Sequence, residues 1–275
     1  MQRVMPWLAT VLVVLGAAAG AVAGSVGVPG QSPGDWVRQV VATTRAAGSA
    51  RVLLLTESTA VFPAGRFHDR STGVVSFRTD AYRLTVTSGS LPGQPRNLLR
   101  LVQVGVGHHG YLVQPEPMVA GRTRPSVIDL GGPHQPAAIE RVFGELASPA
   151  ATWQVHDLGR SSVGGDRTTR YLVTTRPPYV VGVGCSRVSD ATSTVQIWVD
   201  RRHRLVRAET ITHFRIQFSQ SPGMPARPGP SRWETSVNTV DLSDFGVAVT
   251  ISPPPVSSVR VPAYRSSVTV RPRCT

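Results

Sequence analysis

A glycine-rich segment comes nearest to a motif for cofactor chemistry. Residues 105–110, Gly-Val-Gly-His-His-Gly, match the G-x-G-x-x-G spacing of a dinucleotide-binding turn. In that motif the pyrophosphate is held at the N-terminus of a helix that follows the glycines. Here the next residues are Tyr111, Leu112 and Val113, which favour a strand. We therefore predict a glycine-rich hairpin turn and no nucleotide cofactor.

Other catalytic and metal-binding patterns are weak. His108 and His109 are adjacent, so on a strand their side chains point to opposite faces, and the seven histidines include no H-E-x-x-H motif. No G-x-S-x-G nucleophile motif occurs, and Ser161-Ser162 falls in or beside a predicted strand. The acidic residues form no close pair of the glycosidase kind. We expect no metal ion, no cofactor and no enzymatic activity, although a hydrolase built from distant residues stays as a third alternative.

The basic charge comes from arginine alone. The chain has a formal net charge of +13, with 29 Lys plus Arg residues that are all Arg. Such a charge favours acidic lipids, cell-wall polymers or nucleic acid as partners. Only Arg201-Arg202-His203-Arg204 forms a cluster, and it reads as a turn. Because the sequence shows no aromatic stacking platform and no groove-entering helix, we do not expect nucleic acid as a partner.

The N-terminus has the pattern of a secretion signal. Arg3 gives a positive start, Leu8–Leu15 is apolar, and Ala21-Val22-Ala23 fits the small-x-small cleavage pattern. We predict a signal peptide over residues 1–23, a linker over 24–31 and a secreted or extracytoplasmic protein of the cell envelope. An uncleaved anchor helix is the alternative. No Cys lies near the cleavage point, so a lipobox-type lipid anchor is not expected.

The two cysteines, Cys185 and Cys274, are predicted to form a disulfide. In an oxidising compartment an even pair is more often bridged than free. The bridge would tie the C-terminal tail, residues 253–275, to the middle of the chain.

Hydrophobic periodicity predicts two helices and many strands. Ser32 is a suitable N-cap for a helix over Pro33–Ala47, where Trp36, Val37, Val40 and Val41 share a face. A second helix is predicted over Pro136–Leu146, weakened by Gly144. Strands are predicted at 50–58, around Val75 and Phe77, at 82–86, 97–104, 110–114, 153–160, 168–175, 194–200, 204–218, 232–242 and 247–251. Loops are predicted at Pro115–Pro136 and Ser221–Pro230, a hairpin turn at Thr79-Asp80 and a further turn at Gly164-Gly165-Asp166.

Many strands with few helices indicate an α+β, mostly β fold built on a curved antiparallel sheet. Residues 32–252 are predicted to form one domain. Within it, five segments carry a resemblance to a known family when they are taken in order. These are 41–51, 73–77, 163–173, 195–200 with 204–207, and 240–246 with Val249 and Ile251.

The chain resembles the actinobacterial exported lipoproteins of the LppX and LprG type, which share a fold with the lipoprotein carrier LolA. The resemblance implies a half-barrel sheet covered by a few helices, with an apolar cavity for acyl chains. Two departures stand out. Those relatives carry a lipidated Cys after the signal, which this chain lacks, and the Pro115–Pro136 and Ser221–Pro230 loops have no counterpart that we can match.

The leading functional hypothesis is a binder or carrier of lipid or lipidated molecules. Acyl chains entering an apolar cavity leave water at about 0.8 kcal/mol per CH₂ group. The candidate lining residues are the apolar positions of the predicted strands, which could instead simply fill a core. They are Leu53, Leu55, Val75, Phe77, Leu84, Val86, Leu99, Leu101, Tyr171, Val173, Ile197 and Val199.

The alternative hypothesis is an envelope sensor or regulatory module of the same fold, without bound lipid. Its cavity would be collapsed and its surface would recognise a protein partner. Predicted partners are therefore a lipid or acylated ligand, an anionic membrane or cell-wall surface, and an envelope protein.

Overall fold

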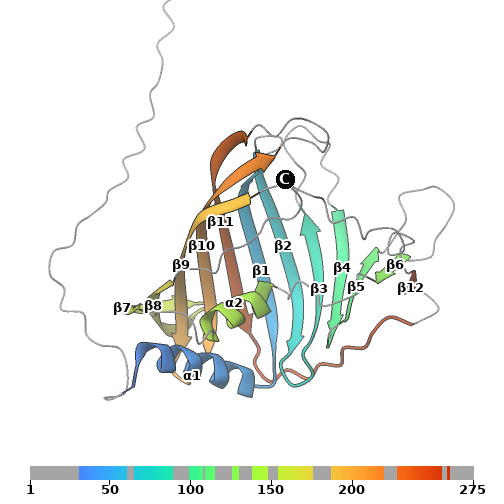
Figure 1. Cartoon of the computed structure of the whole chain (residues 1–275). Coiled ribbons are helices and arrows are strands. Elements are labelled where there is room, and N and C mark those ends of the chain that lie inside the picture. Colours follow the sequence, from blue (N-terminus) through green and yellow to red (C-terminus); the bar gives the residue numbers. More distant parts are fainter. Residues whose placement is uncertain are drawn as a thin grey trace, which may run out of the picture.

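The computed structural model describes residues 31–60, 65–88, 99–107, 109–114, 126–129, 138–147, 154–175, 187–219, 228–255 and 259–260. The predicted signal peptide, both cysteines and most of the C-terminal tail lie outside these residues. The described residues form two helices and twelve strands (Figure 1). Their bounds are α1 Pro33–Ala46, β1 Ser49–Ala60, β2 Gly65–Ser76, β3 Ala81–Ser88, β4 Leu99–Val106, β5 His109–Gln114, β6 Ser126–Asp129, α2 Ala138–Ala147, β7 Gln154–Val163, β8 Asp166–Thr175, β9 Arg187–Asp200, β10 Leu205–Ser219, β11 Pro228–Ser243 and β12 Val259–Arg260.

All twelve strands belong to one sheet. Their order is β12-β6-β5-β4-β3-β2-β1-β11-β10-β9-β8-β7, and every described pairing is antiparallel except that of β12 with β6. The sheet is strongly curved, and both helices lie against the same face near one end of its long strands (Figure 1). The mostly β, curved antiparallel architecture predicted from the sequence is confirmed.

Helix α1 forms where the sequence signals place it. The Ser32 hydroxyl accepts a hydrogen bond from the Asp35 backbone N–H at 3.1 Å, and Pro33 occupies the first turn. Trp36, Val37 and Val40 are buried, so the apolar stripe of the helix faces the sheet. Burial of this stripe holds the helix in place, because a 14-residue helix is marginal on its own.

The core lies between the two helices and the sheet. Val37 and Val40 of α1 and Phe143 and Leu146 of α2 are almost fully buried against strand residues. Aromatic pairs join the layers, since Trp36 packs on Tyr171 with ring centroids 4.6 Å apart and Phe77 packs on Phe143 at 5.7 Å. Such pairs add about 0.5–1.5 kcal/mol each beyond the burial of their area.

The predicted hairpin turns are confirmed. The glycine-rich segment joins β4 to β5, with Val106 paired to His109 and Gly107 in the left-handed region at φ 56°. Thr79-Asp80 joins β2 to β3, with Asp80 at φ 48°. Gly164 and Gly165, at φ 60° and 90°, join β7 to β8, which fits a type I′ turn.

Two assignments from the sequence are wrong. The predicted loop Pro115–Pro136 contains a strand, β6, whose four residues are too few for an alternating pattern to stand out between prolines and glycines. The predicted strand Val247–Ile251 is irregular chain. There the Val247 carbonyl accepts from the Ser49 hydroxyl at 2.6 Å, so a side chain takes the place of a ladder partner.

Candidate ligand-binding face

The sheet has two chemically different faces. We call the face that carries α1 and α2 the inner face and the opposite one the outer face. Val52 and Leu54 of β1 belong to the core beneath the helices, so they point to the inner face. Directly paired residues on neighbouring strands point to the same face, and alternate residues along a strand point to opposite faces. The strand register therefore assigns strand residues to a face wherever the pairing has no register shift.

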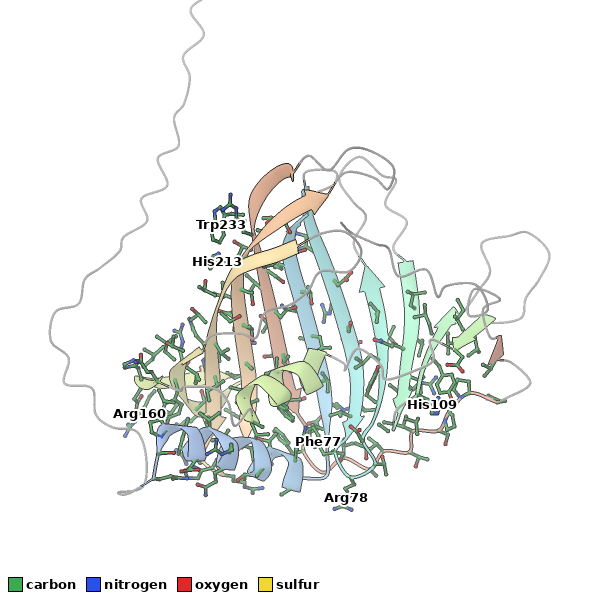
Figure 2. All side chains as sticks on the ribbon, in the orientation of Figure 1. Phe77, Arg78, His109, Arg160, His213 and Trp233 are labelled. Carbon is green, nitrogen blue, oxygen red and sulfur yellow. The ribbon has the colours of Figure 1, made fainter. Side chains whose placement is uncertain are left out.

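Most of the predicted lining residues meet in the core beneath the helices. Val173 and Ile197 are fully buried, and Phe77 lies near the lower edge of the sheet, close to α2 (Figure 2). This group, packed between sheet and helices, consists of Val75, Phe77, Leu84, Tyr171, Val173, Ile197 and Val199.

The other predicted lining residues lie elsewhere. Leu53 and Leu55 alternate with Val52 and Leu54, so they point to the outer face, where Leu55 is 36% exposed. The run of four apolar residues at 52–55 has no alternation that identifies its buried face, so the sequence alone does not assign Leu53 and Leu55 to a face. Val86 and Leu101 point to the inner face but lie outside the core, and the side chain of Leu99 is outside the described residues.

An apolar strip crosses the inner face on strands β3 to β6. Val86 pairs with Leu101, and Leu112 pairs with Ile128. Leu84 of the core pairs with Gln103, which in turn pairs with Leu112, so all of these residues share the inner face. We define the apolar strip as Val86, Leu101, Leu112 and Ile128, each of them half-buried. Helices α1 and α2 pack over the other part of the sheet and do not extend across these strands (Figure 1).

Two rows of polar side chains lie on the inner face beyond the core. On β1, β11 and β10 the first row lies two residues beyond the apolar inner-face residues Leu54, Val240 and Ala208. We call these the polar rows. The first consists of Asp69, Thr56, Asn238 and Thr210, and the second of Ser58, Ser236, Thr212 and Ser193.

Hydrogen bonds connect the polar rows only in part. The Thr56 hydroxyl donates to Asn238 Oδ1 at 2.9 Å, and the Ser193 and Thr212 hydroxyls are 2.9 Å apart. Thr210 is 5% exposed, and its hydroxyl has no hydrogen-bond partner among the described residues. Burying a hydroxyl without a partner costs about 1–3 kcal/mol. The polar rows thus retain hydrogen-bonding capacity that folding alone does not use.

Sequence reading missed the polar rows. The signal was present in β10 and β11, where inner-face positions change from Ala208 and Val240 to Thr210 and Asn238. Isolated Ser and Thr are common in strands, so the change carries meaning only once the register places these residues side by side.

Tyr82 marks the boundary between the core and the apolar strip. Its ring lies against Gly105, where a Cβ atom would be 2.3 Å from the ring. Burial raises the pKa of the Tyr82 phenol above its ordinary value of 10.0, and the negative charge of Asp80 adds to the shift. Tyr82 is therefore a core residue with a buried, neutral phenol, on the strand that also carries Val86 of the apolar strip.

Part of the outer face is covered by charged side chains. Trp198 is only 8% exposed because the guanidinium groups of Arg170 and Arg207 stack over its ring at 5.1 and 5.8 Å. Arg207 also pairs with Asp241, and this hydrogen bond raises the pKa of Arg207. A shallow cleft of about 250 Å³ lies on this face beside Leu55 and Arg70. Farther along the sheet the outer face also carries apolar residues, since Val102 pairs with Val113 and Val113 with Val127.

The described residues also bear on metal and membrane chemistry. Among them, no group of three or more His, Cys, Asp or Glu side chains is placed to hold a metal ion. Neither α1 nor α2 is long and apolar enough to cross a membrane.

Comparisons with known proteins give structural relatives only. No protein-family model matches the chain, and no curated protein sequence matches it significantly. Among solved structures, it is similar to the lipoprotein LppX of Mycobacterium tuberculosis, with 12% identity over 80% of this chain and 97% of LppX and a TM-score of 0.45. LprF of Mycobacterium bovis gives 12% identity, coverage of 82% and 99%, and a TM-score of 0.38.

A LolA superfamily protein of Nitrosomonas europaea is also similar, with 14% identity, coverage of 80% of this chain and 94% of that chain, and a TM-score of 0.24. These similarities, all at 14% identity or below, concern the fold alone.

Proposed function

We propose that this protein binds an amphiphilic lipid on the inner face of its sheet and carries it outside the cytoplasm. The observation that carries the proposal is the apolar strip, a half-buried row of Val, Leu and Ile side chains that α1 and α2 leave uncovered. A strip of this kind provides a surface for an acyl chain, and the adjoining polar rows provide hydrogen-bonding groups for a polar head.

The size of the apolar strip suits a chain rather than a compact molecule. It crosses β3, β4, β5 and β6, which at the usual strand spacing is about 14 Å. Each CH₂ group that leaves water on such a surface contributes about 0.8 kcal/mol. A chain lying along the strip would meet Leu84 and Tyr82 at the edge of the core, where the helices begin to cover the sheet.

The polar rows add selectivity for the head of the lipid. Hydroxyl groups act both as donors and as acceptors, and the Thr210 hydroxyl and Asp69 Oδ1 are buried without a partner among the described residues. A head group with several hydrogen-bonding atoms would satisfy them, whereas a purely apolar ligand would leave them unpaired. In this proposal Val86 and Leu101 contact the chain, and the core residues support the face from beneath the helices.

Binding of a fluorescent long-chain fatty acid tests the proposal, with matched substitutions on the two faces. Leu112→Gln places an amide in the apolar strip, and Leu55→Gln makes the same change on the outer face. We expect Leu112→Gln to weaken probe binding about tenfold, because a contact worth about 1.5 kcal/mol is lost. Leu55→Gln should leave the affinity unchanged, and circular dichroism should confirm that both variants are folded.

Two outcomes would contradict the proposal. One is an equal effect of the two substitutions, which would mean that the probe binds without using the inner face. The other is a native mass spectrum of the protein without any bound lipid, together with no probe binding by the unsubstituted protein. That result would favour the protein-interaction module of the same fold.

A further inference from the structure

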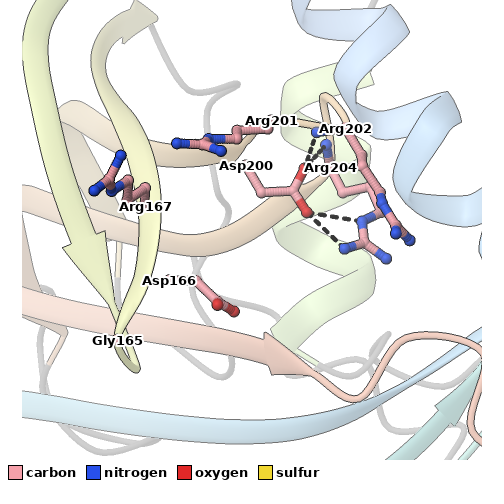
Figure 3. Close-up of a pocket in the computed structure, with 7 residues that line it drawn as sticks. All are labelled: Gly165, Asp166, Arg167, Asp200, Arg201, Arg202 and Arg204. Atoms are coloured by element: carbon pink, nitrogen blue, oxygen red, sulfur yellow. Dashed lines mark hydrogen bonds and ion pairs between the residues drawn. The ribbon is translucent and has the colours of Figure 1, made fainter.

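The strand register brings two hairpin ends together into a basic cleft. Thr168 of β8 pairs with Asp200 of β9, so the β7–β8 turn lies beside the β9–β10 turn. Together they line a cleft of about 540 Å³ (Figure 3). We call it the hairpin-end cleft, and its lining residues are Gly165, Asp166, Arg167, Asp200, Arg201, Arg202 and Arg204.

Both oxygens of the Asp200 carboxylate accept hydrogen bonds from residues of the β9–β10 turn. Asp200 Oδ1 accepts from the backbone N–H groups of Arg202 and Arg204 at 2.8 and 2.9 Å. Asp200 Oδ2 accepts from Arg204 Nε at 2.8 Å and Arg204 Nη2 at 2.7 Å. The Arg204 guanidinium in turn stacks 4.2 Å from the ring of Phe245. Asp200 and Arg204 therefore neutralise each other and fix the shape of the turn.

Three arginines remain at the mouth of the cleft. Arg167, Arg201 and Arg202 are exposed, and within the described part of the chain none of them has an ion-pair partner. The Arg201 side chain extends from its turn toward the hairpin that carries Arg167 (Figure 3). Apart from Asp200, Asp166 is the only carboxylate among the lining residues. The mouth therefore carries excess positive charge, and the hydrogen bonds of Asp200 hold the turn that bears Arg201 and Arg202.

We propose that the hairpin-end cleft docks the protein onto the phosphate groups of anionic phospholipids at a membrane surface. Guanidinium groups bind phosphate oxygens through two parallel N–H donors, and the chain has only Arg for this purpose. The cleft is open and its arginines stand at hairpin tips, so they can reach a flat anionic surface. Each Arg near such a surface contributes about 1 kcal/mol.

The docking site is separate from the lipid-binding face. Residues of the hairpin-end cleft lie in or next to the turns that join β7 to β8 and β9 to β10, whereas the apolar strip lies on β3 to β6, toward the other end of the strand order. The two proposals can therefore fail independently.

Co-sedimentation with vesicles tests the docking. We compare phosphatidylcholine vesicles with mixed phosphatidylglycerol–phosphatidylcholine vesicles, using the unsubstituted protein and two triple variants. The first variant carries Arg167→Gln, Arg201→Gln and Arg202→Gln. The control carries Arg70→Gln, Arg78→Gln and Arg83→Gln, which removes the same charge from exposed positions on or next to β2 and β3.

We expect the unsubstituted protein to bind anionic vesicles more tightly than phosphatidylcholine vesicles. The first variant should bind the anionic vesicles about 100-fold more weakly, and the control should bind them less than about fivefold more weakly. Raising the salt concentration should weaken binding of the unsubstituted protein, because exposed charges are screened. The single charge reversal Arg201→Glu gives a second variant with a smaller change to the turn, and it should also reduce anionic-vesicle binding. All variants should still bind the fluorescent fatty acid.

Three results would overturn the proposal. Equal losses in the two triple variants would mean that only net charge matters. Equal binding to both kinds of vesicle would exclude recognition of the anionic headgroup. Tight binding of inorganic phosphate, measured by calorimetry and able to displace the vesicles fully at constant ionic strength, would identify a small-anion site in place of a membrane-docking surface.

Discussion

The Thr44 hydroxyl of α1 accepts a hydrogen bond from the backbone N–H of Leu205, the first residue of β10, at 2.8 Å. The same hydroxyl donates to the Val40 carbonyl within the helix at 2.7 Å. Thr44 and Leu205 are both fully buried, and a register shift follows Leu205 in the pairing of β10 with β9. One hydroxyl thus joins the helix layer to the sheet where the ladder is irregular.

Replacing Thr44 by Val should destabilise the protein by about 1–3 kcal/mol, because the buried Leu205 N–H loses its acceptor while the volume of the side chain is kept. Thr44→Ser keeps the hydroxyl and should be milder, with about 1 kcal/mol lost for the missing methyl group. Urea unfolding followed by circular dichroism measures both. Equal stability of Thr44→Val and the unsubstituted protein would contradict a structural role for this hydrogen bond.

Two glycine substitutions should change stability in opposite directions. At Gly105 an added Cβ atom would lie 2.3 Å from the Tyr82 ring, so Gly105→Ala must displace a buried aromatic side chain. We expect a loss of about 1–3 kcal/mol. At Gly144 of α2 nothing lies within 4 Å of the added atom, so Gly144→Ala should gain about 0.5–1 kcal/mol from helix propensity. Thermal unfolding should show a lower melting temperature for Gly105→Ala and a higher one for Gly144→Ala than for the unsubstituted protein.

The buried phenol of Tyr82 should make the protein sensitive to alkaline pH. Its pKa is raised in the folded state, so the folded protein holds this proton more tightly than the unfolded chain. The free energy of unfolding should therefore be unaffected below the ordinary pKa of 10.0 and fall as the pH rises above it. The pKa of Tyr171 is raised as well, by burial and by Asp157, so it contributes a second part of the same loss.

Tyr82→Phe tests the contribution of this phenol. Urea unfolding at about pH 8 and about pH 11 should show a smaller alkaline loss in the variant than in the unsubstituted protein. An identical loss in both would assign the alkaline sensitivity to other groups.

Removing the Asp200 carboxylate should loosen the β9–β10 turn. Asp200→Ala takes away the acceptor of two backbone N–H groups and the partner of Arg204, and we expect it to cost about 3 kcal/mol. Asp200→Asn can still accept from the backbone and should cost less. Asp166→Ala, at an exposed position of the neighbouring turn, should change the free energy of unfolding by less than about 0.5 kcal/mol. Equal effects at Asp200 and Asp166 would contradict the difference in their environments.

The sequence predicted those parts of the fold that depend on local signals. Ser32, Pro33 and the apolar stripe of α1 specify a helix through neighbouring residues, and Thr79-Asp80 specifies a turn. The face to which Leu53 and Leu55 point could not be predicted, because it depends on which side of β1 meets the helices.

The candidate sites were harder to predict because they depend on register. The polar rows exist because Thr56, Asn238 and Thr210 lie directly opposite one another on three strands. The hairpin-end cleft places Arg167 beside Arg201, two residues that lie far apart in sequence. The Arg201–Arg204 cluster was visible in the sequence, but its neighbour on the other hairpin was not.

The position of β1 in the strand order has a consequence for how the chain acquires its structure. β1, residues 49–60, lies between β2 and β11, and β11 begins only at Pro228. One edge of this central strand therefore lacks its partner until residues 228–243 have been synthesised. A long-range pairing of this kind forms slowly and leaves an exposed strand edge in the meantime. Until β11 forms, this edge of β1 stays open to pairing with strands of other chains.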